Sequence, residues 1–190
     1  ADRMTDLVKD LLELSRLDNK QVQLNITEID LVHIIKETVA AYDLGTINNG
    51  QNIIQDYHKG QIFLEADSAR VKQVLRNIIS NAIKYNRHKG EVKVATRDHG
   101  DYIEVKISDA GVGIPQEDMG RIFERFYRVD KARSGAMRGT GLGLSIAKEI
   151  MELHQGEIWI SSTLGKGTVV TIYFPKKMVF QVEEDDTVKQ

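Results

Sequence analysis

The stretch at residues 77–85 reads NIISNAIKY, and three further blocks follow it in order: DAGVGIP at 109–115, FERFY at 123–127 and GTGLGL at 139–144. The first block predicts a helix that carries amide side chains, and the second predicts a tight turn with a hydrogen-bonding carboxylate. The third supplies aromatic side chains, and the fourth is a glycine loop that opens a helix. Together these elements are the parts of a nucleotide-binding pocket.

In the first block, Asn77, Asn81 and Lys84 stand at positions i, i+4 and i+7 and so share one stripe of the predicted helix. A neutral amide oxygen can bind Mg²⁺ without a charge that competes with phosphate, so we expect Asn81 to bind the metal, supported by Asn77. Lys84 would neutralise a phosphate, and Tyr85 would offer its ring to the base. An isolated NxxxN pattern is more often only a polar helix surface, but the later blocks favour the site. The neighbouring stripe is apolar and predicts the core-facing side: Val74, Leu75, Ile78, Ile79, Ala82 and Ile83.

In the second block, Asp109 ends a stretch of alternating apolar residues, and Gly111 and Gly113 allow the backbone to bend tightly against a flat ligand. A carboxylate at this place can accept the exocyclic amine of adenine. Guanine carries a carbonyl there, so Asp109 would discriminate between the two bases. Ile114 could form the floor of the pocket. Alone, the pattern DxGxG is more often an ordinary turn.

The fourth block has glycines at alternate positions and lies directly before a helix of good helix formers. Its spacing differs from the dinucleotide fingerprint GxGxxG, and the pattern GxxxxGK(S/T) occurs nowhere in the chain. Backbone N–H groups at the positive end of a helix can bind a triphosphate. A glycine-rich linker is the alternative, but leucines between the glycines are unusual for one. The expected phosphate-binding residues are Thr140, Gly141, Leu142, Gly143 and Leu144.

Between these blocks, residues 121–138 hold six basic residues against two acidic ones. This composition predicts a mobile cationic lid. Phe123 and Phe126 would anchor its base to the core, and Arg128 would approach the γ-phosphate when the lid closes. For most of the other charges, exposure to solvent is the simpler role.

The composition of the whole chain limits its class. Its 190 residues are 41% hydrophobic and 28% charged, with a formal net charge of −2, which is ordinary for a globular protein and gives no case for a nucleic-acid partner. The absence of cysteine excludes disulfides, thiolate metal sites and a thiol nucleophile. No segment approaches the roughly 18 to 20 apolar residues that span a bilayer.

The periodicity of the remaining chain predicts an α+β fold, a two-layer α/β sandwich with a mixed, mostly antiparallel five-stranded sheet and helices on one face. Apolar residues at Met4, Leu7, Leu11 and Leu14 predict an amphipathic first helix that needs a partner. Asp30 and Asp67 or Ser68 are expected N-caps. Further helices are expected at 31–44, 67–85 and 142–153, strands at 22–26, 53–57, 61–66, 91–98, 102–108, 157–162 and 168–174, and a flexible acidic tail at 176–190.

From about residue 22 to 175, the order of the four blocks resembles the ATP-binding boxes of sensor histidine kinases, within the superfamily that also holds gyrase and MutL. The segments FYRVDKARS and GTGLGLSIAKEI resemble the WalK subfamily, although Arg138 stands where that subfamily usually has Gly. The resemblance implies the Bergerat (GHKL) fold, with ATP and Mg²⁺ as cofactors. It also implies that Asn81 binds Mg²⁺, Asp109 binds adenine, Arg128 assists phosphoryl transfer and Thr168 reaches adenine through water. Residues 1–18 resemble part of the second dimerisation helix.

The same resemblance implies a histidine as phosphate acceptor, followed by an acidic residue and a Thr-Pro or similar pair. The chain has five histidines, and none of them has that context: His33, His58, His88, His99 and His154. We therefore expect the acceptor upstream of Ala1. The implied partners are the chain's own dimerisation domain in a homodimeric parent protein and a response regulator whose aspartate receives the phosphate. The implied location is the cytoplasmic side of a bacterial membrane protein. An ATPase or anti-sigma serine kinase of the superfamily, and a non-catalytic ATP-binding module, are the alternatives; the first helix and the FERFY block argue against the serine kinase.

Overall fold

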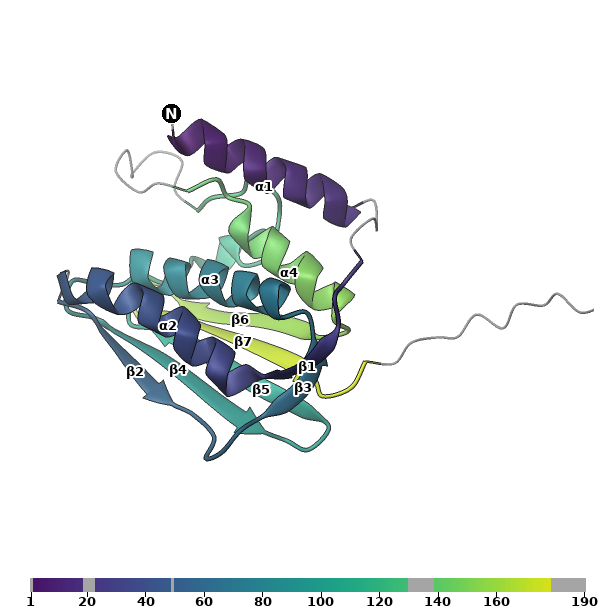
Figure 1. The fold of residues 1–190 in the computed structure, drawn as a ribbon. Coiled ribbons are helices and arrows are strands. Elements are labelled where there is room, and N and C mark those ends of the chain that lie inside the picture. Colours follow the sequence, from purple (N-terminus) through teal and green to yellow (C-terminus); the bar gives the residue numbers. More distant parts are fainter. Residues whose placement is uncertain (1, 19–22, 49, 130–138, 179–190) are drawn as a thin grey trace, which may run out of the picture.

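The computed structural model describes residues 2–18, 23–48, 50–129 and 139–178, which form helices and strands in an α+β arrangement (Figure 1). None of the described helices combines the length and the apolar character that a membrane crossing requires. The helices are α1 Asp2–Asp18, α2 Leu31–Asn48, α3 Ser68–Lys84 and α4 Gly143–Leu153, with a short 3-10 helix at Gln116–Asp118. The strands are β1 Thr27–Asp30, β2 Asn52–Asp56, β3 Phe63–Ala66, β4 Glu91–Asp98, β5 Tyr102–Asp109, β6 Glu157–Thr163 and β7 Gly167–Pro175.

Five strands form one mixed sheet in the order β2-β4-β5-β7-β6. Only the β2–β4 pair is parallel, and the other three pairs are antiparallel. Figure 1 shows α2, α3 and α4 together on one face of this sheet. The predicted two-layer sandwich with a five-stranded, mostly antiparallel sheet is therefore confirmed.

The core lies between the helices and the sheet. Alternate residues of the central strand β5 point into it, and Ile103, Val105 and Ile107 are almost completely buried. The predicted apolar stripe of α3 faces them, with Val74, Leu75, Ile78, Ile79 and Ala82 buried and Ile83 packed against the same cluster. The opposite stripe of α3, which carries Asn77, Asn81 and Lys84, is consequently left at the border of the core.

The first strand differs from the prediction. Alternation favoured a strand at residues 22–26, but residues 23–26 are not in a strand, and β1 begins at Thr27. β1 pairs antiparallel with β3 in a separate two-stranded sheet, with Thr27 opposite Ala66. β3 ends there because Asp67 turns to cap α3, and the N–H of Asn25 donates to the same carboxylate at 2.9 Å. The available partner strand, and not the alternation, decides where pairing starts.

Both predicted N-caps are confirmed. The Asp30 carboxylate accepts from the N–H groups of Val32 and His33 at the start of α2. Asp67 accepts in the same way from the first turn of α3 and satisfies two N–H groups that the helix itself leaves without partners. The other element ends lie close to the predicted ones; α2 runs on past Leu44 to Asn48, since the single Gly45 does not stop a helix.

The backbone N–H of Asp67 also donates to Nε2 of His154, at the C-terminal end of α4. The other ring nitrogen of His154 contacts the carbonyl oxygen of Ile150 at 2.8 Å. Burial lowers the pKa of His154, which keeps the ring neutral and Nε2 able to accept. This contact ties the start of α3 to the end of α4.

Helix α1 lies beside α4 at the top of Figure 1. Leu14 and Leu17, near its C-terminal end, are only 3% exposed. The predicted apolar stripe is otherwise largely uncovered in this chain, because Met4 and Leu11 are exposed. Polar contacts also fix α1: the side chain of Glu13 accepts from Arg70 and Gln73 of α3.

Candidate functional site

The C-terminal half of helix α3 contacts two of the other sequence blocks. The side-chain amide of Asn77 donates to the carbonyl oxygen of Gly143 at 3.0 Å. Two turns further along α3, the amine of Lys84 lies so close to Gly139 that a Cβ there would come within 2.7 Å of it. At the C-terminal end, the carbonyl oxygen of Tyr85 accepts from the N–H of Val112 at 3.1 Å. The structure therefore brings the first, second and fourth blocks together along one helix.

The second block is a turn at the end of β5, and its carboxylate is held by the turn's own backbone. The N–H of Gly111 donates to Oδ1 of Asp109 at 2.8 Å. Burial raises the pKa of the Asp109 carboxyl, although hydrogen bonds from the N–H groups of Gly111 and Thr168 oppose the shift. A Cβ at Gly111 would lie 2.2 Å from the carbonyl oxygen of Tyr85, so glycine is required for the turn to approach α3.

The same turn packs on the hairpin between β6 and β7. Gly113 has a φ of +69°, and a Cβ there would lie 2.1 Å from the carbonyl oxygen of Thr163. The N–H of the half-buried Ile114 donates to Oγ of Ser162 at 2.8 Å. That hydroxyl is also 2.9 Å from Oγ1 of Thr168, which lies opposite Asp109 in the β5–β7 pair. Sequence reasoning found Ile114 and Thr168 but missed Ser162, which no motif marks.

The fourth block bends at Gly141, which has a φ of +76° and whose carbonyl oxygen accepts from the N–H of Phe126 at 3.0 Å. The hydroxyl of Thr140 accepts from the N–H of Leu142 at 3.3 Å and donates to Asp10 of α1 at 2.8 Å. Leu142 is the N-cap of α4, and its buried side chain cannot accept a hydrogen bond from the first turn. The helix thus begins with N–H groups that no cap side chain satisfies, as an anion-binding helix start requires.

The third block is attached differently from the prediction. The ring of Phe126 is 49% exposed, so its predicted role as an anchor to the core is wrong, and the neighbouring Ile122, at 7%, is the buried residue. Phe126 also has a positive φ of 62°, which is uncommon for a residue other than glycine. Phe123 is half-buried with the Lys148 amine 5.8 Å from its ring centroid. Arg128 donates to the carbonyl oxygen of Gly139 at 3.4 Å.

The rest of the predicted lid, including Arg138, lies outside the described residues. Arg128 lies in the described part of the lid, residues 121–129, and stands beside the fourth block. Its contact with Gly139 brings a guanidinium to the same region as the amine of Lys84. Two cations gathered at a glycine segment suit a polyanionic ligand.

Amide side chains are the candidate metal ligands at this place. Within the described ranges, no group of three or more His, Asp or Glu side chains could hold a metal ion. Asn81 is half-buried on α3, between Asn77 and Lys84 on the same stripe. The Asn77 amide nitrogen donates to Gly143, so the amide oxygen is the atom that could bind a cation. Mg²⁺ is usually bound by one or two protein oxygens together with phosphate oxygens and waters, and one or two amide oxygens at this place fit that coordination.

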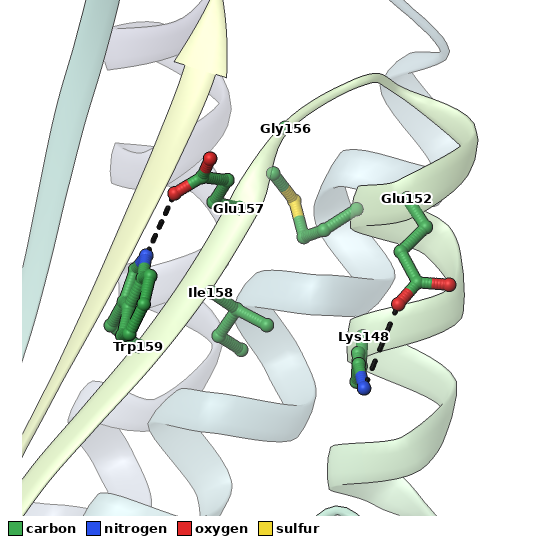
Figure 2. A pocket seen from close by; sticks show the side chains of 7 residues that line it. Lys148, Glu152, Gly156, Glu157, Ile158 and Trp159 are labelled. Atoms are coloured by element: carbon green, nitrogen blue, oxygen red, sulfur yellow. Dashed lines mark hydrogen bonds and ion pairs between the residues drawn. The ribbon is translucent and has the colours of Figure 1, made fainter.

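Two surface cavities lie away from this site. The one in Figure 2 measures about 200 Å³ and lies between α4 and β6, with the side chains of Trp159 and Glu157 bonded at 2.8 Å on one side and the Lys148–Glu152 ion pair on the other. The second, about 430 Å³, lies between α2 and α3, beside Tyr42 and Arg76. None of the predicted site residues lines either cavity. The candidate site is formed by α3, two turns and the start of α4.

Known proteins share this arrangement. Residues 66–178 match the family described as "Histidine kinase-, DNA gyrase B-, and HSP90-like ATPase". The solved catalytic domain of the histidine kinase ThkA superposes with a TM-score of 0.72 and 30% identity, over 81% of this chain and 97% of that one. The chain therefore belongs to this ATPase family and is a catalytic domain of the histidine kinase type. The resemblance to sensor histidine kinases that the four blocks indicated is confirmed.

Within the family, the chain is similar to the sensor histidine kinase WalK of Bacillus subtilis, with 39% identity over 188 residues, or 98% of this chain. The chain spans only 30% of that relative's length. A structure of ThkA in complex with the response regulator protein TrrA is also similar, with a TM-score of 0.75 and 28% identity, over 92% of this chain and 48% of that one. The likeness to WalK agrees with the subfamily that the third and fourth blocks indicated.

Proposed function

We propose that this chain binds Mg·ATP and is the catalytic part of an ATP-dependent protein-histidine kinase. The observation that carries the proposal is helix α3, whose C-terminal end meets the Asp109 turn at Tyr85 and whose preceding two turns, from Asn77, run along the glycine segment. The family to which the chain belongs is one of ATPases. A ligand with a base at one end and phosphates at the other matches this pair of contacts.

At one end, Asp109, Gly111, Gly113, Ile114 and Thr168 would bind adenine. The support is that the N–H groups of Gly111 and Thr168 hold the Asp109 carboxylate in place, and that a carboxylate has further lone pairs with which to accept the exocyclic amine. The hydroxyl of Thr168 and that of its neighbour Ser162 provide a place for a bridging water. The ring of Tyr85 would form a wall of the base site, and the Lys84 amine stands 4.6 Å from its centroid.

At the other end, the residues named for phosphate would act together: Lys84, Arg128, Thr140, Gly141, Leu142, Gly143 and Leu144. Mg·ATP would supply the phosphoryl group and a cation that offsets the charge of the phosphates. The protein's contribution is to orient the chain of phosphates at the start of α4 and to neutralise charge with Lys84 and Arg128, the two residues we propose as catalytic. The hydroxyl of Thr140 would exchange its bond to Asp10 for one to phosphate.

Asn81→Ala is expected to lower the affinity for ATP about tenfold in the presence of Mg²⁺ and to leave it unchanged in EDTA, because only the metal-dependent part of binding uses the amide oxygen. Calorimetric titration under the two conditions measures the difference. Asn52→Ala, an exposed amide on β2, is the matched control. An equal loss with and without metal would remove Asn81 from the metal site and leave it a place in the phosphate site.

The remaining assignments concern the longer parent protein. We infer that residues 1–18 belong to a dimerisation domain whose upstream histidine accepts the phosphate, that residues 22–175 are the catalytic domain, and that the tail from 176 is a separate segment. The phosphate would pass from the histidine to an aspartate of a response regulator, at the cytoplasmic side of the membrane, in a homodimer. The complex of ThkA with a response regulator supports the partner.

Transfer of labelled phosphate tests this function. The chain is incubated with Mg·ATP labelled at the γ position and a separately supplied dimerisation domain that bears the histidine. We expect acid-labile, base-stable label on that histidine, absent when the histidine is changed to Gln. Acid-stable label on a partner serine would identify a serine kinase instead. As a positive control, a related kinase should phosphorylate the same dimerisation domain. If this chain binds ATP but transfers no phosphate to that domain, it is a non-catalytic module.

A further inference from the structure

A closed set of hydrogen bonds surrounds the adenine end of the site. The carbonyl oxygen of Tyr85 accepts from the N–H of Val112 at 3.1 Å, and the carbonyl oxygen of Val112 accepts from the N–H of Gly165 at 2.7 Å. The carbonyl oxygen of Gly165 in turn accepts from the guanidinium of Arg87, two residues beyond Tyr85. The bonds thus return to the segment from which they started.

This ring joins three elements that are distant in sequence: the end of α3, the turn that carries Asp109, and the β6–β7 hairpin. Its two backbone bonds connect each turn to the next. Arg87 supplies the only side chain in the ring, and its bond closes it. Arg87 thus adds a direct bond between the hairpin and the end of α3, beside the connection that runs through the Asp109 turn.

The backbone of Arg87 is itself held in place by hydrogen bonds. The side chain of Gln51, which is 5% exposed, donates to the carbonyl oxygens of Ile83 and Arg87 at 3.1 and 3.4 Å. The carbonyl oxygen of Arg87 also accepts from the N–H of Gly90 at 2.9 Å. The guanidinium therefore reaches Gly165 from a backbone position that buried contacts determine, and less side-chain freedom is lost in forming the bond.

We propose that Arg87 is a positioning residue for adenine recognition, which holds the β6–β7 hairpin against the Asp109 turn. The proposal rests on the proposed nucleotide site. The hairpin contributes the close contact of Thr163 with Gly113 and the hydroxyl of Ser162 that binds Ile114. A hairpin fixed by Arg87 keeps the turn, and with it the carboxylate of Asp109, in one orientation before the base arrives. Preorganisation of this kind improves affinity by reducing the ordering cost of binding.

Arg87→Ala tests the proposal with two separate probes, adenosine and inorganic tripolyphosphate with Mg²⁺. We expect the affinity for adenosine to fall about tenfold, the equivalent of about 1.4 kcal/mol, and the affinity for tripolyphosphate to change by less than about twofold. The preference for ATP over GTP should fall together with the adenosine affinity. Arg87→Lys keeps one donor for the Gly165 carbonyl and should recover part of the loss.

Arg97→Ala is the matched control, because Arg97 is also an exposed arginine that donates to a backbone carbonyl, that of Asp56, away from the site. Hydrogen exchange of the Val112 and Gly165 amides gives a readout without nucleotide and should become faster in Arg87→Ala. If the unaltered protein binds adenosine and Arg87→Ala binds it equally well, the positioning role is overturned and the nucleotide site stands. Equal losses for both probes overturn it too, since they indicate general damage. If the unaltered protein binds neither ATP nor adenosine, the proposed function itself fails.

Discussion

Asp109→Asn should lower the affinity for ATP by roughly 10- to 100-fold, or roughly 1.4 to 3 kcal/mol. The amide can keep the bond from the N–H of Gly111 through its oxygen. Its NH₂ group then stands where the second carboxylate oxygen was, so a donor of the protein would face the exocyclic amine of adenine, which is also a donor. Calorimetry with ATP measures the loss. Asp101→Asn, in the exposed β4–β5 turn, is the matched control.

The same substitution should not harm the apoprotein. Burial raises the pKa of the Asp109 carboxyl above its ordinary 3.8, so the folded protein holds this proton more readily than the unfolded chain. The contribution of this group to stability is therefore largest below pH 3.8 and is lost as the pH rises through the folded-state pKa. At neutral pH the charged form is a cost that the amide does not carry, so the melting temperature of Asp109→Asn should be equal or higher. If the melting temperature of Asp109→Asn is lower than that of the unaltered protein, the loss of ATP binding is explained by unfolding and not by the lost acceptor.

Gly113→Ala is the second change with a large expected effect. The residue has a φ of +69°, and a Cβ would lie 2.1 Å from the carbonyl oxygen of Thr163, so the turn and the hairpin must separate. The strained conformation and the clash together should cost roughly 2 to 4 kcal/mol of stability and more than about tenfold in ATP affinity. Urea unfolding and nucleotide titration measure the two effects.

Gly100→Ala separates these two causes. Gly100 has a φ of +88°, but a Cβ there meets no atom within 4 Å. It should therefore show only the conformational cost, about 1 to 2 kcal/mol, with ATP affinity unchanged. Similar stability losses for the two variants, with ATP binding intact in both, would contradict the close contact between the Asp109 turn and the hairpin.

Local patterns in the sequence predicted much of the fold. The 3.6-residue period of α3 fixed its buried and polar stripes, and Asp30 and Asp67 were found as caps because their effect depends on the next two or three residues. The order of the five-stranded sheet and the separate pairing of β1 with β3 depend on contacts between distant segments. Periodicity alone therefore placed the first strand too early.

The same distinction applies to the candidate site. Asn77, Asp109 and the glycines of the fourth block stand in motifs, and the structure brings them close to α3. Ser162 and Arg87 act through a hairpin whose approach to the Asp109 turn is a tertiary event, so no local pattern marks them. The exposure of Phe126 was not predicted either, and the residue has a positive φ that its residue type rarely adopts.

The contacts at Asn77 and Tyr85, along the C-terminal half of α3, have a consequence for the length of this segment. From Asn77 to Tyr85 the helix rises about 12 Å, at 1.5 Å per residue, and no loop intervenes to absorb a change. Inserting or deleting one residue between them would rotate one end by about 100° relative to the other and detach either the glycine segment or the Asp109 turn. This segment should therefore tolerate substitutions on its solvent side but no change in residue number, whereas the turn at Gly100 can vary in both.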